Sequence, residues 1–292
     1  MLTLASPAKI NLFLHVTGRR PDGYHQLFSL MCCISIQDRI RMEFHGNGMA
    51  VECTHSGVPL DDTNLALNAA RAFYAACADL PAAGLRIRID KRIPVAAGLG
   101  GGSSNAAAVL TGLNAYHGNP LSESELSAVG LSLGADVPFF LFGRPALATG
   151  VGEHLEPFDM VTDYHLVLVF PGFPVSTAMV FSQLNLGLTN REKKPTKALL
   201  KNKGFIAPQH LHNDLETVTL KKYPDIEKAK IWLYDLGALG ALMSGSGPSV
   251  FGLFEDEQAA REAADILREQ SSWQVFATRL VLDPADPIGG SS

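Results

Sequence analysis

Long apolar runs are missing from this 292-residue sequence, although hydrophobic residues make up 47% of it. No run approaches the ~18 residues that a membrane-spanning helix needs, so we expect no membrane partner. An excess of basic residues is missing as well, because 24 lysines and arginines stand against 29 aspartates and glutamates. A surface that wraps nucleic acid usually carries clustered positive charge, and we therefore expect no nucleic-acid partner.

Cysteine is scarce, and no C-x-x-C string occurs among Cys32, Cys33, Cys53 and Cys77. Adjacent cysteines do not pair readily, and a chain of this length does not need disulfides to fold, so reduced thiols are expected. The first residues also lack the basic region of a signal peptide. These features predict a cytoplasmic protein. They leave its oligomeric state open between a monomer and a weak homodimer.

The order of predicted elements favours an α+β protein of two domains, since strands and helices mix without strict alternation. The predicted strands cover residues 10–16, 32–44, 85–89, 165–170 and 275–282, and a glycine turn leading into a strand is expected over 241–254. The predicted helices cover 64–78, 103–117, 122–134 and 257–270. Thr63 would cap the first helix, and Ser122 with Glu125 forms a capping box. We predict domains over 1–158 and 159–284, followed by a disordered tail over 285–292.

The strongest local signal is a glycine-rich loop that opens an alanine-rich helix. Its residues are Pro94, Val95, Ala96, Ala97, Gly98, Leu99, Gly100, Gly101, Gly102, Ser103 and Ser104. Glycines let backbone N–H groups approach an anion closely, and the start of a helix adds unpaired N–H groups and a positive dipole end. The pattern predicts a phosphate site; a tight turn with ordinary capping serines is the competing interpretation.

The loop does not match the two common nucleotide fingerprints. No G-x-x-x-x-G-K-[ST] string is present, and Ser103 stands where the last glycine of G-x-G-x-x-G belongs. This mismatch argues against a dinucleotide-dependent oxidoreductase.

Two residues are candidates for catalysis of phosphoryl transfer. Asp136 lies at a break between apolar stretches, where spacing alone favours a helix N-cap ahead of Pro138. Lys9 precedes an apolar strand, where a lysine could simply extend to water. As a buried pair they would keep the carboxylate ionised and position an acceptor hydroxyl.

Three further patterns are weaker. Tyr24 and His25 follow an Asp-Gly turn and could stack on a ring and hydrogen-bond to it, or form a plain surface turn. The string S-G-S-G over 244–247 is a second glycine turn, either structural or facing a substrate. The histidines, including His210 and His212, suggest no metal site.

Taken together these motifs resemble the GHMP kinases. The similarity is carried, in order along the chain, by P-A-K-I-N-L (7–12), P-D-G-Y-H (21–25), residues 94–105, L-G-A-D-V-P (133–138), G-V-G-E (150–153), N-D (213–214) and S-G-S-G (244–247). The resemblance implies an N-terminal domain like ribosomal protein S5 domain 2, a ferredoxin-like C-terminal domain and an active site between them. The D-G-Y-H string together with A-K-I-N-L points to a member with a diphosphocytidyl substrate.

The resemblance also implies residue roles. Lys9 and Asp136 would be the catalytic pair, residues 94–104 would hold the phosphates of ATP, and Asn64 would lie near the adenine. The expected substrate-binding residues are Asn11, Tyr24, His25, Thr177 and Phe181, with cytosine between Tyr24 and Phe181. The reaction implied is transfer of the γ-phosphoryl group to the tertiary 2-hydroxyl of cytidine diphosphate methylerythritol, in the non-mevalonate route to isoprenoids. Mg²⁺ would bridge the phosphates; its protein ligand stays open, with Ser104 as one candidate.

Two alternatives remain within this resemblance. Another kinase of the family, acting on mevalonate, homoserine or a sugar, would not need Tyr24, His25 and Phe181 to hold a pyrimidine. A non-catalytic nucleotide-binding relative would not need both Lys9 and Asp136.

Overall fold

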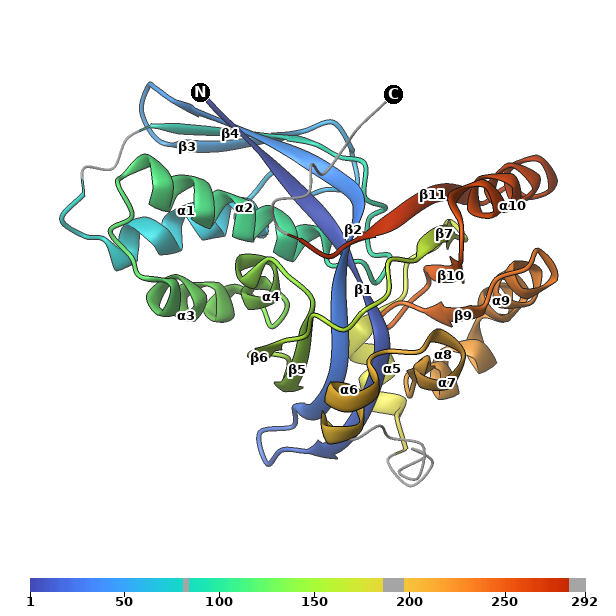
Figure 1. Cartoon of the computed structure of the whole chain (residues 1–292). Helices are drawn as coiled ribbons and strands as arrows, with labels where there is room; N and C mark the ends of the chain where they lie inside the picture. Colours follow the sequence, from blue (N-terminus) through green and yellow to red (C-terminus); the bar gives the residue numbers. More distant parts are fainter. Residues whose placement is uncertain (81–83, 186–196, 284–292) are drawn as a thin grey trace.

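The computed structural model describes residues 1–80, 84–185 and 197–283, and it shows a mixed α/β fold in which long strands cross the centre (Figure 1). The α+β prediction is confirmed. Across these residues, no helix has both the length and the apolar character to cross a bilayer. The tail predicted over 285–292 lies outside the described residues.

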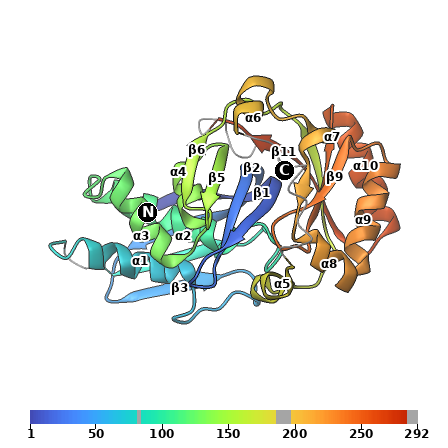
Figure 2. The ribbon, with the colours of Figure 1, turned by 90° about the horizontal axis from the view of Figure 1, so that it is seen from below.

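The N-terminal half runs from β1 to β6. In chain order it contains β1 (Leu2–Arg19), β2 (His25–Phe44), β3 (Met49–Cys53), α1 (Leu65–Ala76), β4 (Leu85–Asp90), α2 (Gly101–Tyr116), α3 (Glu123–Leu133), α4 (Val137–Phe142), β5 (Ala146–Gly150) and β6 (His154–Pro157). Helices α1 to α4 gather on one side of the long β1–β2 hairpin (Figures 1 and 2).

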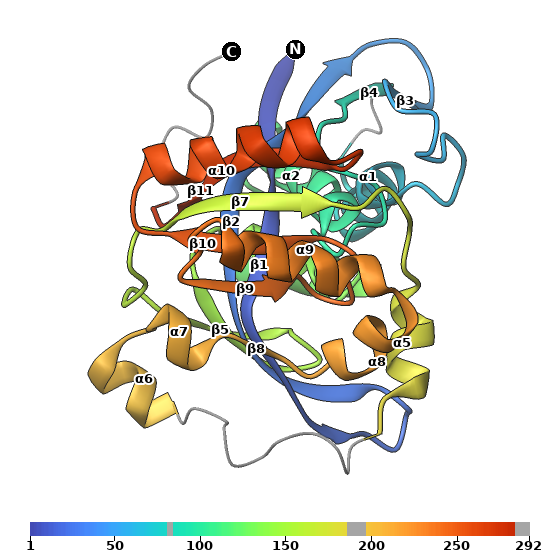
Figure 3. The same ribbon diagram turned by 90° about the vertical axis from the view of Figure 1, so that its right-hand side faces the viewer.

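The C-terminal half begins at β7. It contains β7 (His165–Phe170), α5 (Thr177–Gln183), α6 (Lys197–Lys203), α7 (Ala207–His210), β8 (His212–Asn213), α8 (Glu216–Lys222), α9 (Pro224–Asp235), β9 (Gly240–Met243), β10 (Val250–Phe254), α10 (Glu257–Gln270) and β11 (Gln274–Val281). Strands β11, β7, β10 and β9 are antiparallel neighbours, and α9 and α10 cover one face of them (Figure 3).

The two halves share a sheet and a core. Strand β2 pairs with β1, β4 and β5, and its Ile34 also pairs with Leu280 of β11. One buried cluster contains Leu12 and Ile34 from the first half together with Leu166 and Phe251 from the second. The predicted boundary after residue 158 falls between β6 and β7 and stays a prediction, because this sheet and core are continuous across it.

Several local predictions are confirmed by their caps. Helix α10 covers Glu257–Gln270 as expected, and the Asp256 carboxylate accepts from Ala259 N. The capping box at Ser122 is present. The predicted cap of α1 is wrong: Asn64 Oδ1 accepts from the N–H groups of Ala66 and Leu67, whereas Thr63 donates to Asp61 within the preceding turn. An amide oxygen one residue further on thus satisfies the first orphan donors of the helix.

The start of α2 also differs from expectation. The helix begins at Gly101 rather than at the two serines, and Gly100 is its N-cap with a φ of 70°. Because α2 packs against α1 and β1, close packing outweighs the low helix propensity of two glycines in its first turn. The predicted loop over 98–102 is therefore shorter by two residues.

Candidate active site

A cavity of about 1120 Å³ lies between the two halves. Its wall includes residues of β1, the turn after β1, the glycine-rich loop, the residue before α4, α5 and the turn at 245–246. These segments are far apart in sequence and meet at the cavity. The β1–β2 hairpin lies between helices α1 to α4 and the strands of the second half (Figure 2). A concave site of this size between two halves is where small molecules usually bind.

The glycine-rich loop adopts backbone angles that favour glycine. Gly98 has a φ of 77° and Gly100 a φ of 70°, and Ala96 joins them at 53°. A Cβ on Gly98 would lie 2.3 Å from the carbonyl oxygen of Ser244, and one on Gly100 would lie 2.9 Å from the Phe140 ring. Left-handed residues in close succession turn backbone N–H groups inward, which makes a concave anion site.

The start of α2 adds donors at the same place. The first intrahelical bond runs from Ser104 N to Gly100 O at 2.9 Å, and Gly100 supplies no side-chain cap. The N–H groups of Gly101, Gly102 and Ser103 are thus left for another acceptor, at the positive end of a 16-residue helix. A phosphate group fits this combination.

The second glycine turn supports the loop from behind. Ser244 Oγ donates to Gly98 O at 3.0 Å, and Ser249 N donates to Ala97 O at 3.3 Å. Lys9 N donates to Leu99 O at 3.0 Å from the other side, so β1 and the 244–249 turn hold the loop between them. The structural interpretation of the S-G-S-G string is therefore confirmed, while Gly245 and Ser246 also reach the cavity wall.

Lys9 and Asp136 meet at the cavity. Lys9 Nζ lies 3.7 Å from Asp136 Oδ2, and the two side chains are 6% and 39% exposed. Asp136 is the N-cap residue of α4, as the competing interpretation held, but its side chain makes no capping hydrogen bond. The carboxylate is therefore available to the cavity.

A relay of hydrogen bonds holds the lysine in place. Lys9 Nζ donates to Asn11 Oδ1 at 2.8 Å, Asn11 Nδ2 donates to Ser29 Oγ at 2.8 Å, and Ser29 Oγ donates to the Phe13 carbonyl at 2.6 Å. All members of the relay are buried. Because a buried polar group must be paired, this relay fixes where the ammonium points.

Another part of the cavity wall is aromatic. The His25 ring stacks on Phe181 of α5, with 5.0 Å between the ring centroids, whereas Tyr24 is 63% exposed. Burial, and secondly the positive charge of Arg19, lower the pKa of His25 from its usual 6.5. Thr177 and Ser246, which also line the cavity, share a 2.7 Å hydrogen bond. The three residues that sequence analysis placed around a pyrimidine thus lie together, with His25 rather than Tyr24 on the Phe181 ring.

Two other predicted residues have side chains that are already engaged. Asn64 lies on the cavity wall, but its amide caps α1 and donates to Pro59 O at 2.7 Å. All predicted site residues belong to the described part of the chain, and Ser104 is the one among them that does not line the cavity. The Ser104 Oγ accepts a hydrogen bond from Ser6 Oγ at 2.8 Å. Every other predicted site residue lies on the wall.

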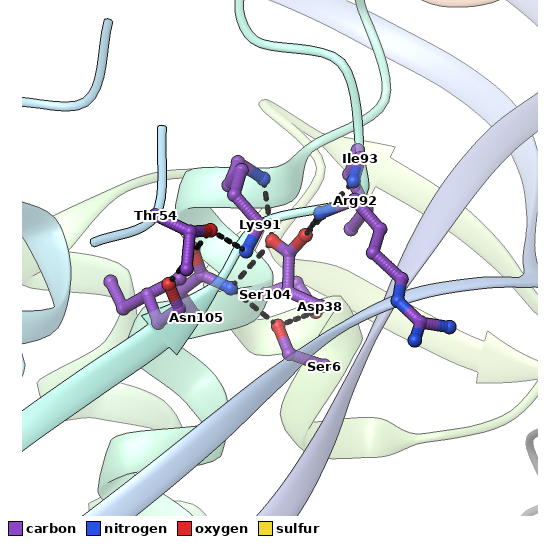
Figure 4. Close-up of polar contacts among 9 residues, drawn as sticks. Ser6, Asp38, Thr54, Lys91, Arg92, Ile93, Ser104 and Asn105 are labelled. Atoms are coloured by element: carbon purple, nitrogen blue, oxygen red, sulfur yellow. Dashed lines mark hydrogen bonds and ion pairs between the residues drawn. The ribbon is translucent and has the colours of Figure 1, made fainter. Parts of the chain in front are cut away.

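A buried charge beside the loop was not predicted from the sequence. Asp38, fully buried in β2, binds the Lys91 ammonium at 2.5 Å and is also hydrogen-bonded to Asn105 (Figure 4). Lys91 and Asn105 both line the cavity. Its position in the two-residue alternation is a signal that could have revealed it, because Asp38 falls in phase with the buried Ile40 and Met42 of the same strand. Carboxylates are rarely buried unless paired, so a partner would then be expected.

His212 has partners that its sequence position did not reveal. Its Nε2 lies 2.7 Å from Asp214 Oδ1, and its ring stacks on His15 at 4.4 Å between centroids. The donor atoms of these three residues lie within 4.8 Å of one another, a spacing that a metal ion would fit. The expectation that the histidines form no metal set stays a prediction. The group lies off the cavity wall, and Asp214 also accepts from Val16 N at 2.6 Å, which ties the second half to β1. It therefore offers no ligand to an ion in the cavity.

Comparison with known proteins agrees with this geometry. The model of the GHMP kinases N terminal domain matches residues 64–144, and that of the GHMP kinases C terminal domain matches residues 197–272. The chain belongs to the GHMP kinase family. It is 47% identical to a 4-diphosphocytidyl-2-C-methyl-D-erythritol kinase of Syntrophotalea carbinolica, over 97% of this chain and 100% of the relative. It is 49% identical to the protein of the same name from Geobacter sulfurreducens, over 96% and 99%.

Solved structures agree as well. A crystal structure of 4-(cytidine 5'-diphospho)-2C-methyl-D-erythritol kinase superposes with a TM-score of 0.79 at 36% identity, covering 96% of this chain and 99% of that one. A homoserine kinase from Cytophaga hutchinsonii superposes with a TM-score of 0.75 at 16% identity, covering 96% and 95%. The second likeness shows the shared fold alone.

Proposed function

We propose that this protein transfers the γ-phosphoryl group of ATP to the tertiary 2-hydroxyl of 4-diphosphocytidyl-2-C-methyl-D-erythritol, a step of the non-mevalonate pathway to isoprenoids. The observation that carries the proposal is the placement of Lys9 and Asp136 at 3.7 Å in one cavity with the glycine-rich loop and the His25–Phe181 pair. The full-length relatives that carry this name support it.

The residues divide between the two substrates. The N–H groups at the start of α2 and in the loop would hold the triphosphate. The His25–Phe181 pair would take the cytosine, whose flat ring can stack on an aromatic side chain. Asn11 and Thr177, which also line the cavity, would contact the rest of the acceptor.

Asp136 would act as general base for the acceptor hydroxyl, with its carboxylate accepting the proton as the oxygen attacks the γ-phosphorus. Lys9, fixed by the Asn11–Ser29 relay, would hold the carboxylate and neutralise charge on the transferring group. Because phosphoryl transfer depends on positioning and electrostatics, a rigid pair is what the reaction requires.

The cavity wall offers few oxygen ligands, so Mg²⁺ would be held mainly by the phosphates of the nucleotide. Among the described residues on the wall, the carboxylates are Asp22 and Asp136, and Ser103 is the hydroxyl at the start of α2 that faces the cavity. Mg²⁺ commonly keeps several waters and binds phosphates with only one or two protein oxygens. When bound it would neutralise the β- and γ-phosphates.

The decisive test is ADP release from ATP with a panel of acceptors: 4-diphosphocytidyl-2-C-methyl-D-erythritol, mevalonate, homoserine and galactose. We expect turnover with the cytidine compound alone. Turnover with mevalonate, homoserine or galactose instead would assign another kinase activity of the family. ATP binding without turnover of any acceptor would indicate a non-catalytic relative.

A further inference from the structure

Asp38 makes four polar contacts while its side chain is completely buried. Its Oδ1 accepts from the backbone N–H groups of Arg92 and Ile93 at 2.8 and 2.9 Å. Its Oδ2 accepts from Lys91 Nζ at 2.5 Å and from Asn105 Nδ2 at 2.9 Å (Figure 4). A buried carboxylate is costly unless it is paired and hydrogen-bonded, and both of its oxygens are satisfied here.

The four donors lie on the two sides of the glycine-rich loop. Arg92 and Ile93 immediately precede Pro94, where the loop starts, and Asn105 lies in α2 just after Ser104, where it ends. One carboxylate on a central strand therefore fixes both ends of the loop relative to β2. The amide of Asn105 also donates to Ser6 Oγ of β1 at 2.8 Å, so the strand that carries Lys9 joins the same network.

Asp38 also determines where a positive charge lies. The Lys91 side chain is 5% exposed, and its ammonium lies 2.8 Å from the position of a Cβ on Gly101, in the first turn of α2. A cation there is repelled by the positive end of the helix dipole, so it stays only because a paired carboxylate faces it. The Lys91 ammonium lies beside the unpaired N–H groups at the start of α2, so it adds positive potential where phosphate would bind.

We propose that Asp38 is a positioning residue for the nucleotide: it clamps both ends of the glycine-rich loop and holds the Lys91 ammonium beside the first turn of α2. This inference rests on the proposed binding of ATP at that loop. Asp38 itself is not among the residues that line the cavity, so it would act on the nucleotide only through the loop and Lys91.

The variant Asp38→Asn tests this directly, because it keeps the shape and one acceptor oxygen but turns an NH₂ group toward the donors of Lys91 and Asn105. We expect the Kd for ATP, measured by calorimetry, to rise at least about tenfold, since breaking a buried charged contact costs at least the ~1.4 kcal/mol that a factor of ten represents. The Kd for cytidine diphosphate, which probes the His25–Phe181 part of the wall, should change less than about twofold, because the partners of Asp38 are Lys91, Arg92, Ile93 and Asn105 and sites without shared partners behave additively.

The matched control is Asp90→Asn. Asp90 lies beside Lys91 and forms an ion pair with Arg41, but its side chain is 32% exposed and it does not line the cavity. We expect ATP binding by this variant to equal that of the wild type. Hydrogen exchange gives an independent readout: the amides of residues 95–104 should exchange faster in Asp38→Asn, and those of β7 and β10 should not.

If Asp38→Asn does not fold, Asn105→Ala replaces it, because this neutral variant removes one of the four contacts and leaves the ion pair. A smaller rise in the Kd for ATP, with unchanged binding of cytidine diphosphate, would support the clamp. Unchanged ATP binding, or an equal loss of both ligands, would overturn it. A wild-type protein that binds no ATP would instead remove the proposed function.

Discussion

The Lys9 ammonium and the Asp136 carboxylate approach within 3.7 Å although they come from the first strand and from the residue before α4. The lysine is buried and held by Asn11, whereas the aspartate is exposed enough to meet a ligand. The two members of the pair therefore have different tasks. The fixed lysine provides positive charge, and the accessible carboxylate can receive a proton.

Asp136→Asn should therefore lower turnover strongly and leave ATP binding nearly intact. The amide keeps the size of the side chain but cannot accept the proton of the acceptor hydroxyl, and loss of a general base typically costs about 10²- to 10⁴-fold in rate. Steady-state ADP release and calorimetry with ATP measure the two effects. The control variant is Asp159→Asn, which makes the same chemical change at an exposed aspartate. Near-normal turnover by Asp136→Asn would exclude this residue as the base.

Phe181→Ala should weaken the cytidine substrate by about 1–3 kcal/mol, the range known for loss of one stacking partner of a base. Tyr24→Ala should act in the same direction if Tyr24, 63% exposed, moves onto the other face of the base. Tyr234→Ala, on α9 and 52% exposed, is a matched control. The Michaelis constants for both substrates separate the effects: the value for ATP should not change. Unaltered cytidine affinity in both variants would refute the aromatic site.

Binding of the cytidine substrate should weaken on acidification through His25. Burial and Arg19 lower the pKa of His25 below 6.5, so the ring is neutral at pH 7 and above. As the pH falls through that lowered value, protonation adds a second positive charge beside Arg19 and removes the acceptor nitrogen of the ring. The Kd for cytidine diphosphate should be constant above pH 7 and rise below about pH 6.5.

His25→Gln should have a smaller acid dependence than the wild type, because glutamine does not titrate. His154→Gln, whose side chain is 74% exposed in the wild type, should keep the wild-type profile. The same acid profile in His25→Gln and wild type would assign the effect to another group.

Gly98→Ala and Gly102→Ala should change stability in opposite directions. At Gly98 a Cβ meets the Ser244 carbonyl at 2.3 Å, and the left-handed backbone alone costs about 1–2 kcal/mol for an alanine. At Gly102 the nearest atom is 3.4 Å away, at the end of the Leu65 side chain, and alanine in a helix gains up to about 1 kcal/mol over glycine. Urea unfolding of both variants measures the difference. Equal destabilisation would contradict the role of the left-handed turn.

Some predictions that depended only on neighbouring residues are confirmed. The bounds of α10 and the box at Ser122 follow from side chains within one helical turn. The left-handed loop at Gly98 and Gly100 follows from the absence of a Cβ. The cap of α1 failed by one residue, since Thr63 and Asn64 are both good caps and only the turn at Asp61 decides between them.

By itself, therefore, the sequence determined the left-handed turn of the phosphate loop, the bounds of α10, the capping box at Ser122 and the chemical types of the site residues. The tertiary structure decided which side chains meet: Lys9 with Asp136, His25 with Phe181, and Asp38 with the donors on both sides of the loop. The physical reason is that caps and backbone angles are set by interactions over a few residues. A buried charge or a stacked ring, in contrast, gets its partner only when the long β1–β2 hairpin joins the two halves around one core.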